Sequence, residues 1–145
     1  MRIAIIFSIT VLMLSFIIPE SMDNKSAATY IYLGSGFTND TVSLGIETFQ
    51  VLTSEVVSSN QDHNDLTDIY IKMTNDSIFC YKSSTLLLKQ TMKGDGKSIK
   101  ILITINNHPY SYTMHLKQGR YVFISKHASL YNVYFNQFKR PVSLY

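Results

Sequence analysis

The chain has 145 residues, of which 46% are apolar and 16% charged, and its formal net charge at pH 7 is +3. This length leaves room for one domain. The single cysteine, Cys80, excludes an internal disulfide, and roughly 120 residues can bury a sufficient core without one.

The N-terminus carries the pattern of an export signal. Arg2 precedes an apolar run at 3–18, and Pro19 ends it. A basic tip, an apolar run and a polar exit are typical of a secretory signal peptide, and the run is shorter than the ~20 residues of a membrane-spanning helix. A retained membrane anchor is the alternative. We predict an exported protein (periplasmic, at the cell surface or secreted) with a signal peptide or anchor at 1–21, a linker at 22–28 and a domain at 29–145.

Along the domain, apolar and polar residues alternate with a period of two, which indicates strands with one buried face. In chain order, the alternating segments are 41–46, 69–74, 99–106 and 110–117. Shorter apolar runs lie between and after them, at 78–81, 86–91 and 121–125. The segment 47–59 is either one long bent strand or two strands around Thr53-Ser54.

Turn-forming residues separate these segments at short intervals, as in a sandwich or small barrel. They are Asn39-Asp40, Asn75-Asp76, Gly94-Asp95-Gly96, Asn106-Asn107-His108-Pro109 and Gln118-Gly119. We predict an antiparallel β-sandwich of about seven to nine strands, immunoglobulin-like or transthyretin-like, preceded by an N-terminal apolar signal helix.

One local stretch adds a resemblance. The sequence LKQGRYVFISK, from Leu116 to Lys126, resembles the Leu-Lys-x-Gly-x-Tyr corner of small exported sandwich domains of the carboxypeptidase-regulatory-like and PEGA-like kind. The resemblance implies the same fold class and a binding or accessory role. It covers this segment alone and carries over no functional residues.

The sequence NQDHNDLTD at 60–68 is rich in residues that bind cations or form turns. Calcium loops of the EF-hand type need alternating oxygen ligands, a Gly at the bend and a closing Glu. Leu66 interrupts the alternation, and neither the Gly nor the Glu follows, which excludes such a loop. A looser cation site formed by Asp62, Asp65 and Asp68 is one interpretation. The other interpretation is a hairpin loop made of turn-forming residues. If this loop has a role beyond the turn, we expect it to be partner recognition rather than catalysis.

Motifs for enzymatic chemistry are absent from the sequence. No Gly-x-Ser-x-Gly frame occurs, and the four histidines (His63, His108, His115 and His127) form no helical pair. Cys80 lies in an apolar strand, where we expect a buried, unreactive thiol. Gly34-Ser35-Gly36 lacks the third Gly of a dinucleotide loop, so we expect a bend at a strand end. We predict no catalysis and no cofactor; a small hydrolase or metal-dependent enzyme that uses the 62–68 loop is the alternative.

Charge divides the chain into two halves. Residues 22–68 hold seven acids and one base, whereas 69–145 hold eleven bases and two acids. We expect the halves to mix on the surface of the fold; a basic surface for an anionic partner is the alternative. The candidates for partner binding, where aromatic rings stand beside cations, are Lys126, Tyr134, Lys139 and Arg140.

Together these observations predict a non-enzymatic binding or structural module of the cell envelope or extracellular space. Its partner would be a protein or an envelope polymer, such as a polysaccharide whose sugar rings stack on tyrosines. An exported protein seldom meets nucleic acid, so we expect none. The segment 140–145, with Pro141, fits a sheet edge that pairs with a partner strand. A membrane-tethered accessory subunit, held through residues 3–18, is a further alternative.

Overall fold

The computed structural model describes residues 27–60, 66–93, 96–127 and 132–141, and this part of the chain is all β. The ten strands are β1 (Thr29–Leu33), β2 (Asp40–Ile46), β3 (Phe49–Val57), β4 (Ile69–Met73), β5 (Ser77–Lys82), β6 (Thr85–Thr91), β7 (Ser98–Ile105), β8 (His108–His115), β9 (Tyr121–Lys126) and β10 (Val133–Phe138). Within these ranges, no helix is long and apolar enough to cross a membrane.

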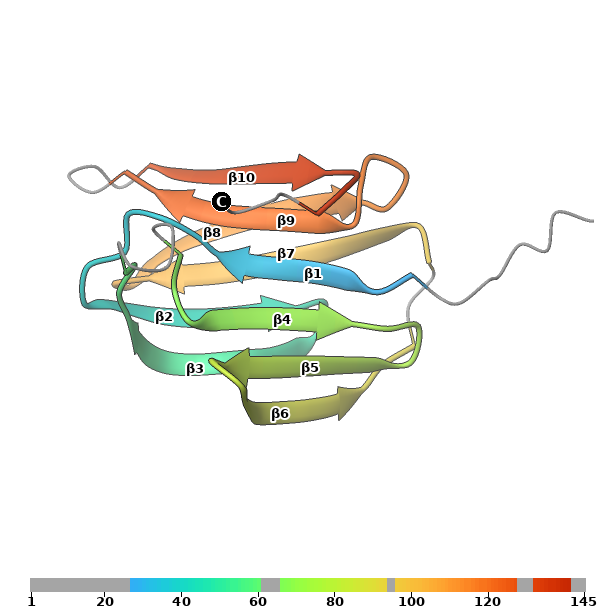
Figure 1. The fold of residues 1–145 in the computed structure, drawn as a ribbon, viewed down its shortest axis with the longest axis horizontal. Coiled ribbons are helices and arrows are strands. Elements are labelled where there is room, and N and C mark those ends of the chain that lie inside the picture. Colours follow the sequence, from blue (N-terminus) through green and yellow to red (C-terminus); the bar gives the residue numbers. More distant parts are fainter. Residues whose placement is uncertain (1–26, 61–65, 94–95, 128–131, 142–145) are drawn as a thin grey trace, which may run out of the picture.

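The strands form two facing sheets (Figure 1). One has six strands in the order β10-β9-β1-β4-β5-β6, and the other has four in the order β3-β2-β7-β8. Every neighbouring pair is antiparallel except β1 with β9, which run parallel. The predicted two-sheet, all-β architecture is confirmed, whereas the predicted number of strands was too low and the sheet is not wholly antiparallel. β1 lies between β9 and β4 and runs parallel to β9 and antiparallel to β4.

The core lies between the sheets, where one side chain in two points inward from each strand. The six-stranded sheet contributes Ile31, Leu33, Ile69, Ile71, Ile78 and Ile124, and the four-stranded sheet contributes Val42, Leu44, Ile46, Ile101, Ile103 and Met114, all fully buried. This dry, close-packed layer supplies most of the stability of the domain.

An ion pair crosses the core at one end of the sandwich. The Lys126 ammonium in β9 lies 2.6 Å from the Asp40 carboxylate in β2, and their side chains are only 14% and 3% exposed. Asp40 also accepts hydrogen bonds from the Thr38 N–H and the Asn106 amide. Burial raises the pKa of Asp40, but these hydrogen bonds outweigh it and hold that pKa below its ordinary value.

Two predicted irregular regions have clear structures. Within the segment 47–59, Phe49–Val57 form one strand, β3; Ser54 has φ 50° inside it, and its N–H donates to the Ser43 hydroxyl. The hairpin between β7 and β8 turns at Asn106 and Asn107 alone, whose φ values of 48° and 68° are those of a two-residue type I′ turn.

Candidate functional site

The connection from β3 to β4 is the place of the predicted cation site. Asp62 and Asp65 lie outside the described residues. Asp68 binds the turn between β5 and β6: its carboxylate accepts the Ser83 hydroxyl at 3.3 Å, and its backbone carbonyl accepts the Ser83 N–H at 2.6 Å. Among the residues that the structure describes, no three His, Cys, Asp or Glu side chains are grouped as metal ligands. The cation site stays a prediction.

The same connection was predicted to be a hairpin loop, and this was wrong. β3 is at the edge of the four-stranded sheet, and β4 is inside the six-stranded sheet, so the chain crosses from one sheet to the other. Asn60 and Leu66 form a bridge across the crossing, and the Thr67 hydroxyl donates to the Leu33 carbonyl at 2.8 Å. The sequence could not distinguish a hairpin from a crossing because both use turn-forming residues.

The four residues predicted to bind a partner do not form one surface in the structure. The Lys126 side chain points inward to Asp40, whereas Tyr134 on β10 is 49% exposed. Lys139 and Arg140 follow β10 and are also exposed. The segment 140–145 begins after the edge strand β10, and 142–145 lie outside the described residues.

Cys80 is a buried member of the core, as predicted. Burial, and secondarily the charge of Glu55, raises the pKa of this thiol to about 11. At neutral pH the sulfur is therefore protonated and shielded from solvent, which is the opposite of what a nucleophile needs.

The outer side of the six-stranded sheet carries a cluster of aromatic side chains, which we call the aromatic face. Its members are Tyr30 and Tyr32 on β1, Tyr70 on β4, Phe79 and Tyr81 on β5, and Tyr121 and Phe123 on β9. Strand alternation turns each of them away from the core, and the register places Phe123, Tyr32, Tyr70 and Tyr81 in one row across four strands.

The rings of the aromatic face stack on one another. Tyr32 and Phe123 have centroids 4.8 Å apart with planes 18° apart, and Tyr70 and Tyr81 are 4.9 Å and 11° apart. Two nearly parallel rings at this distance overlap face to face with an offset. The rings in this row therefore cover each other's faces; the three tyrosines are partly exposed, whereas Phe123 is only 9% exposed. Burial, and then neighbouring tyrosines, raises the pKa of both Tyr32 and Tyr70, so their hydroxyls stay protonated.

Both ends of the aromatic face are covered by other side chains. The Lys89 ammonium on β6 lies 5.6 Å from the centroid of the Phe79 ring. At the other end, the Phe138 ring on β10 meets Phe123 edge-on, with centroids 5.7 Å apart. Side chains from β6 and β10 thus contact the two ends of the stack.

The outer side of the four-stranded sheet is chemically different. It carries small and polar side chains: Thr41, Ser43 and Gly45 on β2, Lys100, Leu102 and Thr104 on β7, and Ser111, Thr113 and His115 on β8. Two large apolar side chains also lie on this side: Val56 on β3, 59% exposed, and Leu102 on β7, 39% exposed. Within one small domain, therefore, one outer face is polar and the other aromatic.

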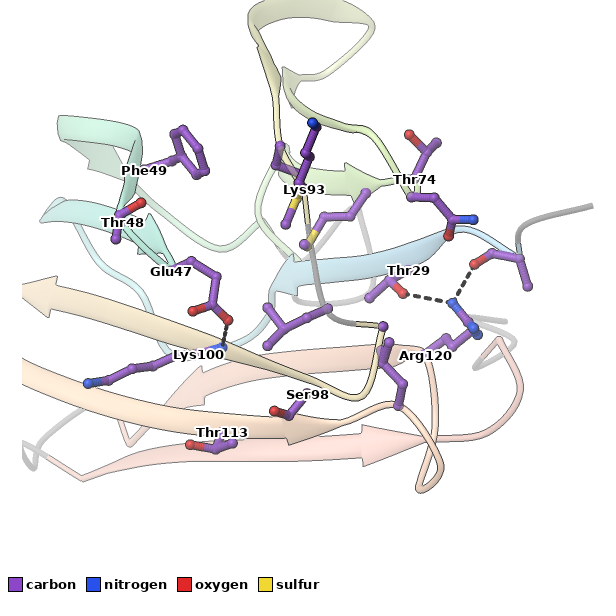
Figure 2. Close-up of a pocket in the computed structure, with 17 residues that line it drawn as sticks. Thr29, Glu47, Thr48, Phe49, Thr74, Lys93, Ser98, Lys100, Thr113 and Arg120 are labelled. Atoms are coloured by element: carbon purple, nitrogen blue, oxygen red, sulfur yellow. Dashed lines mark hydrogen bonds between the residues drawn. The ribbon is translucent and has the colours of Figure 1, made fainter.

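A pocket of about 850 Å³ opens at the end of the sandwich where β1, β7 and β9 begin (Figure 2). Its apolar lining consists of Phe49, Met73, Met92, Ile99 and Leu116, and its charged lining of Glu47, Lys93, Lys100 and Arg120. The Arg120 guanidinium donates to the Ala27 carbonyl at 2.6 Å and to the Thr29 hydroxyl at 3.4 Å. The Glu47 carboxylate accepts the Lys100 N–H at 2.6 Å.

Sequence reasoning placed the aromatic binding residues near the C-terminus and missed the aromatic face. A signal was present: Tyr occupies outward positions in TYIYL, IYIKM and SIFCYK, where a solvated strand would carry polar residues. Which of these positions share a face, however, depends on the order and register of the strands.

Comparisons with protein-family models, with curated proteins and with solved structures find no match for this chain. The resemblance of Leu116–Lys126 to PEGA-like domains stays a prediction. The site is therefore interpreted from its own geometry.

Proposed function

We propose that this protein is an exported, non-enzymatic binding module that recognises another protein through the aromatic face. The observation that carries the proposal is the contrast between the two outer faces. A sheet that faces water on one side is normally polar there, as the four-stranded sheet is. A contiguous, partly exposed apolar surface on one face is typical of an interaction site.

The chemistry of the aromatic face suits a protein partner. Tyrosine offers a large, rigid contact area and a hydroxyl, with little entropy to lose on binding, and it is enriched at protein interfaces. Because each ring is held between its neighbours, the surface is ordered before any partner arrives, which reduces the entropic cost of binding.

A polysaccharide is the less favoured partner. Sugar rings would need open aromatic faces, whereas Tyr32, Tyr70 and their neighbours cover each other's faces. What the row offers to a ligand is ring edges and phenol hydroxyls, which fit a mixed apolar and hydrogen-bonding surface. This geometry supports a protein surface over a stacked glycan.

The state of Cys80 supports a non-enzymatic role, since its raised pKa keeps the thiol neutral. Asp68, a member of the alternative hydrolase site, is engaged with Ser83. Export is proposed from the apolar run at 3–18. The finer assignment to immunoglobulin-like or transthyretin-like sandwiches is supported by the two facing sheets and is part of the proposal.

The test is affinity capture from the envelope and extracellular fractions of the source cells, with three baits. They are the natural protein, a Tyr32→Ser/Tyr70→Ser variant and a Leu102→Ser variant as the control from the other outer face. We expect one protein that the natural bait and the control retain and the Tyr variant loses. Identical retention by all three baits would refute the role of the aromatic face. Loss of a retained polysaccharide in the Tyr variant alone would replace the protein partner by a polymer.

A further inference from the structure

Strand β6 is an edge of the six-stranded sheet, and the other sheet does not cover it. β3, an edge of the four-stranded sheet, lies against β5, where Glu55 pairs with Lys82 at 3.3 Å. β6 projects beyond both strands (Figure 1), and none of its seven residues is buried. Within the described residues, no strand pairs with the outer edge of β6, so this edge is open to another strand.

Leucines dominate this open edge. Leu86 and Leu87 are 48% and 44% exposed, and Leu88 is partly exposed. Leu87 is an extra residue between the pairs Tyr81–Leu86 and Cys80–Leu88, which makes this part of β6 a β-bulge. Apolar side chains along an unpaired edge strand favour association with a further strand.

The features that normally protect an edge strand are few on β6. Proteins protect such strands with proline, with outward charges, with bulges or with a covering segment. β6 has no proline, and its one charged residue is Lys89. The Lys89 ammonium lies 5.6 Å from the centroid of the Phe79 ring on β5, so this charge is directed back over its own sheet. The bulge at Leu87 remains, and it limits regular pairing to a short ladder.

The other three edge strands are better protected. β8 carries Pro109, and Tyr112 of this strand stacks on Phe135 of β10 with ring centroids 4.9 Å apart. This contact closes the side of the sandwich where β8 and β10 lie. On β3, Ser54 has φ 50°, and the register with β2 shifts within the strand. β6 is therefore the edge best suited to accept a further strand.

We propose that two copies of this chain pair antiparallel through β6, about a two-fold axis, and form one continuous sheet. An antiparallel edge complements its own copy in hydrogen bonding, which favours a second copy as the occupant. In such a pair one residue faces itself across the axis. Leu88 places an apolar pair there, whereas Lys89 would place two like charges there. Gln90 at the axis would set both Leu87 and Leu88 opposite residues past the end of the strand.

The pairing of Leu88 with itself has two consequences. Leu87 of each copy lies opposite Lys89 of the other copy. A two-fold axis perpendicular to the sheet keeps both aromatic faces on one side, and the row that reaches Tyr81 then continues through Leu86 into the second copy. This inference goes beyond the proposed recognition of a protein and does not depend on it, because β6 holds no member of the aromatic face.

The test is sedimentation equilibrium of the natural protein over a range of concentrations, combined with hydrogen exchange. We expect a reversible equilibrium between monomer and dimer. As the dimer forms, exchange should slow at backbone amides of β6 and stay unchanged at those of β8. A monomer at every concentration would overturn the proposal.

Opposite charges at position 87 test the register. Leu87→Lys sets a second lysine opposite Lys89 of the other copy and should weaken the dimer about tenfold or more. Leu87→Glu sets a carboxylate there and should weaken it less than about threefold. The combined Leu87→Lys/Lys89→Glu variant should regain the dimer, because opposite charges then face each other. Equal weakening by Leu87→Lys and Leu87→Glu, without this recovery, would refute the proposed pairing.

Two further variants separate β6 from the outer faces of the two sheets. Leu102→Lys adds the same charge at a similarly exposed leucine on β7 and should leave the dimer unchanged. The Tyr32→Ser/Tyr70→Ser variant should also dimerise as the natural protein does, which keeps this test independent of the aromatic face. A dimer that the Tyr variant loses and Leu87→Lys retains would overturn the proposal and place the contact between copies on the aromatic face.

Discussion

The Lys126 ammonium donates hydrogen bonds of 2.6 Å to both carboxylate oxygens of Asp40, so a buried ion pair joins β9 of one sheet to β2 of the other. The two residues are 86 positions apart in the chain. Lys126 was selected from the sequence as a residue for partner binding. Its position instead makes it a connection between the layers of the sandwich.

Removing one member of this pair should destabilise the domain strongly. We expect Lys126→Met to lower the free energy of unfolding by about 3 kcal/mol, because Asp40 would stay buried without its counter-ion. The control is Lys82→Met, whose pair with Glu55 is 40% and 37% exposed and should contribute no more than about 1 kcal/mol. Urea unfolding at pH 7 measures both. Equal losses in the two variants would contradict the special role of the buried pair.

The same carboxylate should make stability depend on acidity. The pKa of Asp40 in the folded protein lies below its ordinary value of 3.8. The stabilisation from the Asp40 carboxylate is therefore fully present above pH 3.8 and is lost as the pH falls through the pKa of the folded state. Between about pH 5 and pH 2, the natural protein should lose more unfolding free energy than Asp40→Asn. A smaller loss would remain in the variant because a hydrogen bond from Thr74 also lowers the pKa of Asp76. Parallel pH profiles of the two proteins would argue against this linkage.

The stacked rings of the aromatic face should be energetically coupled. A double-mutant cycle of Tyr70→Ser and Tyr81→Ser should give a coupling of about 0.5–1 kcal/mol, since these rings lie 4.9 Å apart. The control cycle pairs Tyr70→Ser with Phe138→Ser, whose strands are separated by β1 and β9, and should give a value near zero. If both cycles gave the same coupling, the effect would come from general loosening of the sheet.

Gly36 should be the least replaceable glycine of the domain. Its φ is +87°, and a Cβ at this position would lie 1.7 Å from the Lys126 carbonyl oxygen. Gly36→Ala should therefore cost about 3 kcal/mol or more. Gly96 has φ +71°, but a Cβ added there would meet no atom within 4 Å, so Gly96→Ala should cost only about 1 kcal/mol. Thermal unfolding of both variants distinguishes a close contact from backbone strain alone.

Cys80 should react very slowly with thiol reagents in the folded protein. Its thiol is buried and its pKa is about 11, so a thiol reagent at pH 8 should modify it at least about 100-fold more slowly than in the urea-unfolded chain. The measurement is the release of a chromophoric disulfide reagent over time. Rapid modification without denaturant would show that this part of the core opens to solvent.

The strands whose alternation is plainest in the sequence are those whose outer side chains are polar. In β7, Lys100 and Thr104 alternate with isoleucines, and the pattern is plain. In β1 and β10, outward positions hold Tyr30, Tyr32 and Phe138, so the alternation of apolar and polar residues is hidden. The aromatic residues that conceal these strands are also those that distinguish the candidate binding surface.

Long-range relationships could not be predicted in the same way. The pairing of Tyr30 with Tyr121 and of Asp40 with Lys126 depends on which strands become neighbours. Local patterns specify a strand and its buried face, but the order of strands in a sheet follows from the packing of the whole chain. The pocket was missed for the same reason, because its lining comes from both sheets.

The parallel pairing of β1 and β9 has a consequence for how the domain folds. β1 is the first strand of the domain along the chain, yet it lies in the interior of its sheet, and Tyr30 pairs with Tyr121 near the other end. A chain that leaves the ribosome or a translocation channel N-terminus first must keep β1 without its second neighbour until β9 emerges. Closing so long a loop makes folding slow, in the millisecond to second range of other all-β domains. During that interval Tyr30 and Tyr32 lack their neighbours Tyr121 and Phe123, so the aromatic face is completed only when β9 pairs with β1.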